Sequence, residues 1–319
     1  MTVPTTARRF DRAASRIPDR LFRGSTGVFG WFVVALVLAV GAMLALNSGQ
    51  ALGKFGWSFV TGSTWDPVAG VYGALPYIIG TLASAGIAIL LATPIGLLTA
   101  IFLAELAPRR VALPLTFTIE LLAAIPSVVY GLWGVFVLAP FLKTTIETPI
   151  TDALGWIPIF AGPVFGIDLF AAGVILTLMI LPTIVSISRE VLTSVPGAQR
   201  EAMLALGATR WETISRVVLP TARPGIVGAV ILGLGRALGE TMAVTMVIGN
   251  GQSIPTRLFD HAQTIASQIA TTFNEASLGL QTSALIALGL ILLVITVGLN
   301  IVARVLVRRV AGPGRDERR

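Results

Sequence analysis

Apolar residues in this chain stand in long uninterrupted blocks rather than at the periodic spacing of an amphipathic surface helix. One helix needs about 20 consecutive apolar residues to cross roughly 30 Å of hydrocarbon. Blocks of that kind lie at residues 28–46, 74–103, 112–138, 165–187, 225–248 and 282–305. We therefore expect an all-α, polytopic membrane protein with six transmembrane helices.

Prolines interrupt or border several of these blocks, at Pro76, Pro94, Pro126 and Pro182. Within a membrane, the backbone groups that a proline frees can be satisfied by neighbouring helices or by polar side chains. We expect the helices to be kinked at these positions.

The composition excludes a soluble globular domain, because 55% of the 319 residues are hydrophobic and only 12% are charged. There is no cysteine, which excludes disulfides and thiolate metal sites. The single histidine, His261, has no partner at metal-ligand spacing, so we expect no metal site. The two lysines, Lys54 and Lys143, do not follow the glycine frame of a Walker loop. We expect no bound nucleotide and no cofactor.

The net charge of +7 could indicate binding to nucleic acid, but the cations cluster at the ends of the apolar blocks. Positive charge is retained on the cytoplasmic side of a membrane. Lys and Arg concentrate in the basic arm at 1–27, in the second and fourth connections and around the tail at 308–319, whereas the remaining connections hold only Lys54, Lys143 and Arg257. We therefore expect both termini in the cytoplasm and the lipid bilayer, not nucleic acid, as the surroundings.

The first block follows an arginine-rich stretch, as the core of a signal peptide does, but it is too long for such a core. The residues after it, 47–50, offer no convincing small-residue cleavage site. We expect an uncleaved first span followed by an external loop at 47–72.

The connection between the fourth and fifth blocks predicts a hairpin of two short helices at 194–220. Gly207 stands where the first helix would end in the left-handed conformation. Thr209 and Glu212 have the Thr-x-x-Glu spacing of a capping box, which predicts the start of a second helix. We expect Pro220 to end that helix.

This hairpin resembles the EAA signature of ABC importer permeases, with matches at Glu201, Ala202, Gly207, Leu219 and Pro220 and apolar replacements at Met203 and Val217. In that family the loop docks into a groove on the ATP-hydrolysing subunit. The resemblance therefore implies a coupling role for these residues, with Trp211 either contacting the ATPase or anchoring at the lipid surface. An ordinary surface hairpin is the alternative.

The fifth block, from Gly233, reads GLGRALGETMAVTMVIGN and resembles the corresponding helix of permeases from phosphate transport systems. Sulfate and molybdate permeases share the Ala-Leu-Gly-Glu portion but usually continue with Phe. The resemblance extends over the whole chain in length and topology, and it implies a type I ABC importer permease fold with a five-helix core at 73–307.

The same resemblance implies that this chain is a non-catalytic subunit in a bacterial plasma membrane, with inorganic phosphate as the substrate. The implied partners are a second permease subunit, two ATP-binding subunits and an external phosphate-binding protein. Three alternatives stay open: a permease for sulfate or molybdate, a proton-coupled secondary carrier that uses Glu240, and a membrane scaffold without a pathway. The EAA spacing opposes the last two.

Charged residues inside the blocks are candidates for the translocation pathway. Arg236 stands about 20 Å into its helix, and Glu240 follows it by four residues, a spacing that allows an ion pair on one helix face. An unpaired charge at that depth costs several kcal/mol, so ionisable groups within spans are functional candidates by default. The alternative is a structural pair beside the small residues Gly235 and Gly239. Glu120 in the third block is a further candidate, although helix packing is its more expected role.

Overall fold

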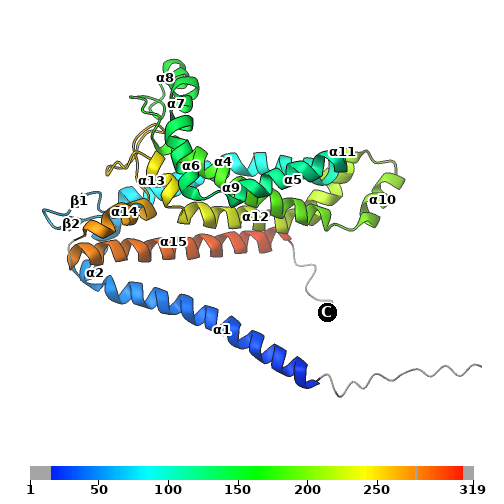
Figure 1. Cartoon of the computed structure of the whole chain (residues 1–319), viewed down its shortest axis with the longest axis horizontal. Coiled ribbons are helices and arrows are strands. Elements are labelled where there is room, and N and C mark those ends of the chain that lie inside the picture. Colours follow the sequence, from blue (N-terminus) through cyan, green and yellow to red (C-terminus); the bar gives the residue numbers. More distant parts are fainter. Residues whose placement is uncertain (1–15, 277–278, 312–319) are drawn as a thin grey trace, which may run out of the picture.

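The computed structural model describes residues 16–276 and 279–311, and these are largely helical (Figure 1). Within them, six helices are long and apolar enough to cross a membrane, which confirms the expected all-α polytopic class. These spans are Leu21–Asn47, Leu75–Leu106, Ser127–Leu154, Leu169–Thr193, Arg210–Gly239 and Leu280–Val305. Residues 1–15 of the expected basic arm and 312–319 of the expected tail lie outside the described residues.

The elements follow one another along the chain as α1 (Arg16–Asn47), α2 (Gly49–Phe55), α3 (Ser58–Thr61), β1 (Trp65–Asp66), β2 (Val71–Tyr72), α4 (Leu75–Ile101), η1 (Phe102–Leu106), α5 (Arg109–Ala124) and α6 (Ser127–Trp133). They continue as η2 (Gly134–Leu138), α7 (Ala139–Leu142), η3 (Lys143–Glu147), α8 (Thr148–Leu154), α9 (Leu169–Thr193), α10 (Gly197–Ala205) and α11 (Arg210–Thr213). The last are η4 (Ile214–Val218), α12 (Leu219–Gly239), α13 (Met242–Val247), α14 (Ile265–Thr272), η5 (Phe273–Glu275) and α15 (Leu280–Ala311).

Helix α9 is the centre of the bundle, with α4 and α12 packed along it (Figure 1). Small residues allow the close approach. A Cβ atom on Gly173 of α9 would collide with Ile87 of α4, and one on Gly225 of α12 would collide with Val191 of α9. Because a packed interior tolerates little change in volume, these contacts hold the three helices together as one unit.

The third apolar block, expected as one span at 112–138, is two helices. Helix α5 ends at Ala124, Ile125 and Pro126 are extended, and α6 begins at Ser127. The residue before a proline is pushed out of the helical region, so the expected kink at Pro126 is a complete break. The Tyr130 hydroxyl bridges it by donating to the Leu122 carbonyl at 2.8 Å.

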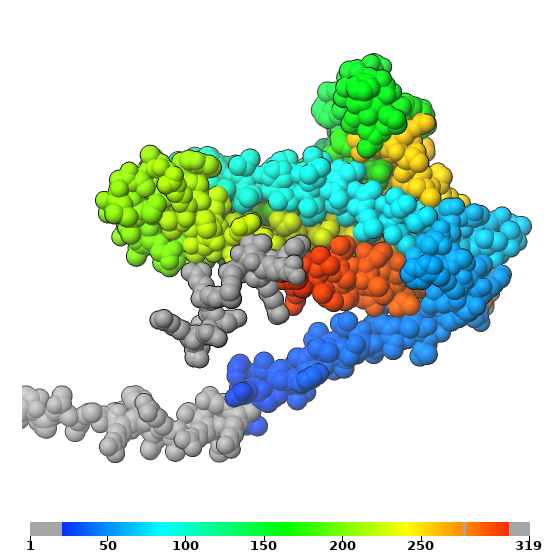
Figure 2. All heavy atoms as spheres, turned by 180° about the vertical axis from the view of Figure 1, so that it is seen from behind, coloured from blue at the N-terminus to red at the C-terminus, as the bar shows by residue number. Residues whose placement is uncertain are grey.

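Beyond the break, the chain from α6 to α8 stands away from the axis of the bundle. Its α-helical turns alternate with the π-helical segments η2 and η3. Figure 2 shows this segment in green, projecting above the bundle. The helices α10 and α11, in yellow-green, lie at the opposite end of the molecule from α2. The external half of this span is therefore not a straight continuation of α5.

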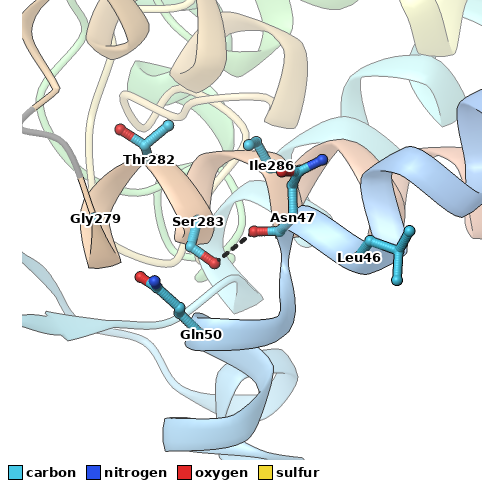
Figure 3. A pocket seen from close by; sticks show the side chains of 7 residues that line it. All are labelled: Leu46, Asn47, Gln50, Gly279, Thr282, Ser283 and Ile286. Carbon is cyan, nitrogen blue, oxygen red and sulfur yellow. Dashed lines mark hydrogen bonds between the residues drawn. The ribbon is translucent and has the colours of Figure 1, made fainter.

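Helix α1 packs on α15 near its C-terminal end and diverges from the bundle elsewhere (Figure 1). Ser283 of α15 fixes the corner between α1 and α2, because its hydroxyl donates to the Asn47 carbonyl at 2.8 Å and accepts from the Ala51 N–H at 3.2 Å. The shallow pocket beside this corner is lined by Leu46, Asn47, Gln50, Gly279, Thr282, Ser283 and Ile286 (Figure 3). It contains none of the expected site residues.

Two carboxyl groups meet in the interior where η3 packs against the start of α9. Glu147 and Asp168 have no exposed surface, and their carboxyl groups are close enough to interact electrostatically. Asp168 also caps α9, since its Oδ1 accepts from the Ala171 N–H at 2.9 Å. Because two buried like charges repel each other, these two side chains are a sensitive point in the packing of the projecting segment on α9.

This arrangement makes a prediction about Glu147. Glu147→Gln removes one of the two like charges and keeps a polar side chain beside Asp168, so we expect the Tm of the purified protein to stay nearly unchanged or to rise. Glu147→Ala leaves the Asp168 carboxyl buried without its partner, which costs about 1–3 kcal/mol and should lower the Tm. Thermal unfolding in detergent measures both variants. Equal Tm values for the two would show that the pair does not hold this segment.

Candidate functional site

The expected hairpin is present between α9 and α12. Gly207 follows the first helix, α10, with φ of +84°, so the left-handed position is confirmed. The capping box is also confirmed, because the Thr209 hydroxyl accepts from the Glu212 N–H at 3.2 Å and the Glu212 carboxylate accepts from the Thr209 N–H at 2.9 Å. Both features are local, and the sequence spacing alone determines them.

The expected end of the second helix at Pro220 is wrong. Helix α11 continues through the π-helical segment η4 into α12, with Pro220 in the first turn of α12. Proline has no backbone N–H to donate. It is tolerated at this position because the hydrogen-bonding pattern changes here from the i+5 spacing of the π-helix to the i+4 spacing of the α-helix, so the missing N–H leaves fewer backbone groups unpaired. The second helix of the hairpin is therefore continuous with the fifth span.

The hairpin presents apolar side chains to solvent. Trp211 and Leu206 are 65% and 84% exposed, and Leu204 is 48% exposed. The signature residues Glu201 and Ala202 are exposed on α10, which has no buried residue at all. An exposed apolar surface bordered by charged groups is typical of a protein interaction site. Leu219 and Pro220 lie at the base of the hairpin, where it joins the bundle.

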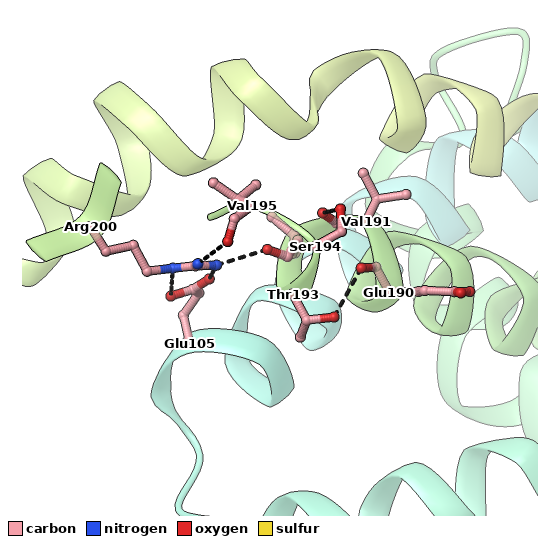
Figure 4. A network of polar contacts seen from close by, with 8 residues as sticks. Glu105, Glu190, Val191, Thr193, Ser194, Val195 and Arg200 are labelled. Atoms are coloured by element: carbon pink, nitrogen blue, oxygen red, sulfur yellow. Dashed lines mark hydrogen bonds and ion pairs between the residues drawn. The ribbon is translucent and has the colours of Figure 1, made fainter. Parts of the chain in front are cut away.

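A polar network at the base of the hairpin was missed by the sequence analysis (Figure 4). Arg200 of α10 forms a two-point ion pair with Glu105 of η1, with Nη2 to Oε1 at 2.7 Å and Nε to Oε2 at 3.3 Å. The same guanidinium donates to the Leu192 carbonyl at 2.8 Å and to the Val195 carbonyl. In the sequence, Arg200 is one of several cations in the fourth connection and indicates only the orientation of the chain in the membrane. The sequence feature that could have indicated Glu105 is a lone carboxylate at the cytoplasmic end of a span.

The expected ion pair between Arg236 and Glu240 is absent from the described part of the chain. The i,i+4 geometry requires an unbroken helix, but α12 ends at Gly239 and the backbone of Glu240 is extended. The Glu240 carboxylate instead accepts from the Ala243 N–H at 3.2 Å and so caps the first turn of α13. The fifth block, expected as one span at 225–248, is therefore two helices as well.

The two broken helices meet beyond their breaks. Helix α6 packs on α13, where Gly131 lies against Ala243. Arg236, in the last turn of α12, is near enough to Tyr130 of α6 for an electrostatic interaction. Its guanidinium is exposed and has no hydrogen-bond or ion-pair partner among the described residues. Broken helices in membrane transporters occur where backbone and side chains line a cavity or a binding site.

The remaining candidates lie on open faces of the chain. Glu120 is exposed on α5, apart from any ion pair between described residues. Gly235 and Gly239 have open space where their side chains would stand, so none of the helices in the described residues packs closely against them. The alternative of a structural pair buried within this chain is therefore not supported.

Comparison with known proteins adds a family assignment to this geometry. Residues 92–312 match the family of binding-protein-dependent transport system inner membrane components. The chain is 47% identical to the phosphate transport system permease protein PstC of Mesorhizobium japonicum, over 96% of this chain and 93% of that protein. It is 46% identical to PstC of Haemophilus influenzae, over 91% of this chain and 93% of that protein.

Solved structures resemble it in fold. A chain of a bacterial ABC transporter for alginate import matches with a TM-score of 0.61 at 19% identity, over 95% of this chain and 100% of that chain. A chain of the inward-facing MetNI methionine ABC transporter matches with a TM-score of 0.58 at 19% identity, over 77% of this chain and 99% of that chain. The expected ABC importer permease fold is confirmed.

The glycine of the hairpin allows a test of the docking role that we expect for this segment. A Cβ at Gly207 would have free space, so the only penalty of a substitution is the left-handed backbone, about 1–2 kcal/mol for an L-residue. We expect Gly207→Val to insert normally but to retain the ATP-hydrolysing subunit several-fold less well in pull-down. Gly207→Asn is the matched control, since Asn tolerates this conformation and should behave nearly as wild type. Normal retention by the Val variant would contradict a docking role for this turn.

Proposed function

This chain belongs to the family of binding-protein-dependent transport system inner membrane components, and on that basis we propose that it is the permease subunit of an ATP-driven importer of inorganic phosphate. The observation that supports phosphate is the 47% identity over nearly the whole chain to a protein named as a phosphate transport permease. The chain is a multi-pass inner-membrane protein and catalyses no covalent reaction itself.

The proposed assembly contains a second permease subunit of similar fold, two ATP-binding subunits and an external phosphate-binding protein. The exposed apolar side chains of the hairpin supply a surface for an ATP-binding subunit, through Trp211 and the signature residues Glu201 and Ala202. Among the solved relatives in fold, the alginate transporter was determined in complex with its substrate-bound periplasmic protein. That architecture supports an external binding protein here.

We place both termini on the cytoplasmic side. The described ends of the terminal helices, α1 at Arg16 and α15 at Ala311, lie toward the same end of the bundle as α10 and α11 (Figure 1). Positively charged residues gather at that end, in agreement with their retention in the cytoplasm. An ATP-binding subunit docked on the hairpin would then have access to cytoplasmic ATP.

We assign Arg236 to the translocation pathway. A hydrogenphosphate ion must lose part of its hydration shell to cross, and a guanidinium offers a planar fork of donors that can replace it. Arg236 has no protein partner among the described residues, so its donors are available. Glu240 and Glu120 would contribute negative charge to the pathway. This charge would weaken the binding of phosphate enough to permit its release.

Alternating access follows from the continuity of α11, η4 and α12. Movement of the docked hairpin turns α12 directly, and Arg236 is carried in the last turn of that helix. Because α12 is packed on α9 and α9 on α4, the bundle responds as a unit rather than by bending. Closure of the ATP-binding subunits would thus change the side on which Arg236 is accessible.

The division of labour between subunits gives the first test. The purified chain alone should hydrolyse no ATP, because it has no Walker loop to hold the phosphates. Hydrolysis should appear when the ATP-binding subunit and the second permease are added, and it should rise with the phosphate-loaded binding protein. Substantial hydrolysis by the isolated chain would contradict the assignment.

The second test concerns Arg236 and Glu240. Since the two do not form an ion pair, Arg236→Gln should leave assembly unchanged while lowering phosphate uptake about tenfold or more, because a hydrogen bond to a charged group contributes about 1.5–3 kcal/mol. The measurement is radiolabelled phosphate uptake by cells without other phosphate carriers, normalised to assembled complex. Full phosphate uptake by the Arg236→Gln variant would contradict a role for Arg236 in the pathway. If sulfate competed with phosphate for uptake by the wild-type complex, a different oxyanion would be indicated as the substrate.

Glu240 needs two variants, because it has two separable properties. Glu240→Gln keeps an oxygen that can accept from the Ala243 N–H, so it should preserve assembly and report only on the charge. Glu240→Ala removes the cap as well, which costs about 1 kcal/mol, and it should lower the Tm in addition. If both variants assemble and transport as wild type does, Glu240 has neither role.

A further inference from the structure

The two helices of the coupling hairpin are joined to the bundle in different ways. Helix α11 runs on through η4 into α12, so its connection is a continuous helical backbone. Helix α10 has no buried residue, and its packing within the chain is against α11 and η4. No apolar contact of a buried side chain therefore fixes α10 to the rest of the molecule.

Arg200 supplies the missing attachment. Its guanidinium connects α10 to the last turn of α4 through Glu105 in η1, and to the end of α9 through the carbonyls of Leu192 and Val195 (Figure 4). These carbonyls lie at a helix C-terminus, where a cation is favoured. One side chain thus joins α10 both to the neighbouring end of α9 and to η1, which is distant in sequence.

The ion pair has the properties of a rigid connection rather than of a surface contact. The side chains of Arg200 and Glu105 are only 22% and 11% exposed, so solvent weakens their attraction less than at an open surface. Two parallel N–H to oxygen bonds also fix the angle between guanidinium and carboxylate, which a single contact does not. The other ion pair of the hairpin, Arg216 with Glu212, is a single contact at 3.8 Å and much more exposed.

The receiving end of this connection is well placed. Glu105 stands in a single π-helical turn that terminates α4, and such turns often mark functional positions in helices. Helix α4 is in turn packed closely along α9 and also touches α12, the helix that carries Arg236. A displacement imposed on Glu105 therefore reaches the same bundle that α12 belongs to, but through α4.

Resting on the proposed function, we propose that the Arg200–Glu105 ion pair is the link that transmits movement of α10 to α4, so that the docked hairpin drives the bundle at two points. The continuous helix through α11 moves α12, and the ion pair moves α4. Both residues are positioning residues, since neither touches phosphate or ATP. Without the pair, α10 could still bind the ATP-binding subunit, but its movement would no longer be passed to α4.

The test uses the complete complex reconstituted in vesicles with the binding protein, and measures ATP hydrolysis and phosphate uptake together. For Glu105→Gln and Arg200→Gln we expect normal assembly and continued hydrolysis, with phosphate transported per ATP reduced at least about fivefold, the lower end of typical coupling effects. Arg223→Gln is the control, because it removes an exposed guanidinium on the same side of the bundle but outside the hairpin. It should transport as wild type does.

A second arm replaces the ion pair by a covalent link. The chain has no cysteine, so Glu105→Cys with Arg200→Cys gives a unique pair that a short bifunctional thiol reagent can bridge reversibly. We expect the reduced pair to be uncoupled and the bridged pair to regain most of its transport per ATP, while each single cysteine variant gains nothing from the reagent.

The outcomes separate this proposal from the function on which it rests. Normal transport per ATP in the Gln variants would overturn the link, as would a parallel loss of assembly, hydrolysis and uptake that bridging does not restore, because that pattern describes a purely structural contact. The wild-type complex in the same vesicles tests the proposed function itself. If it failed to import phosphate with ATP, the assignment as a phosphate importer would fail whatever the variants did.

Discussion

The constraint on which this structure depends is that a backbone polar group in hydrocarbon must find its hydrogen bond within the protein. Continuous helices meet it without help, which is why most of the chain is helical. The two breaks inside the apolar blocks meet it by special means. Tyr130 supplies a donor to the Leu122 carbonyl across the first break, and Glu240 supplies an acceptor to the Ala243 N–H across the second. Polar side chains at membrane depth are thus required by the backbone before any question of substrate arises.

That constraint also explains what the sequence could and could not predict. Blocks of apolar residues report where a helix can be buried in lipid, so the number of spans and the fold class followed from hydropathy alone, whereas the third span lies at Ser127–Leu154 rather than at 112–138. Hydropathy does not report continuity, because Ile125 fits an apolar block equally well as a helical or an extended residue. The predicted Arg236–Glu240 pair failed for this reason, since its spacing has meaning only in an unbroken helix.

The hairpin shows the same division between local and distant information. Gly207 and the Thr209–Glu212 capping box were predictable, because each depends on residues within one turn. The position of Pro220 within a continuous helix was not predictable. Proline usually ends a helix, but the π-helical segment before Pro220 allows the helix to continue. The Arg200–Glu105 pair joins residues 95 positions apart, and no periodicity in a single sequence carries that information.

The exposed face of α12 supports the proposed second permease subunit. Arg236, Leu232 and Gly239 are exposed along that helix, and no described residue packs where a side chain would stand at Gly235 or Gly239. Lipid is a poor neighbour for such a face, because a guanidinium in hydrocarbon costs several kcal/mol and small residues leave gaps that acyl chains fill badly. A second permease with glycines or small residues of its own could pack closely there and leave Arg236 facing the space between the subunits. In such a complex, Arg236 would be available to an anion for the same reason that it is exposed in the isolated chain, because no part of the chain described by the structure covers it.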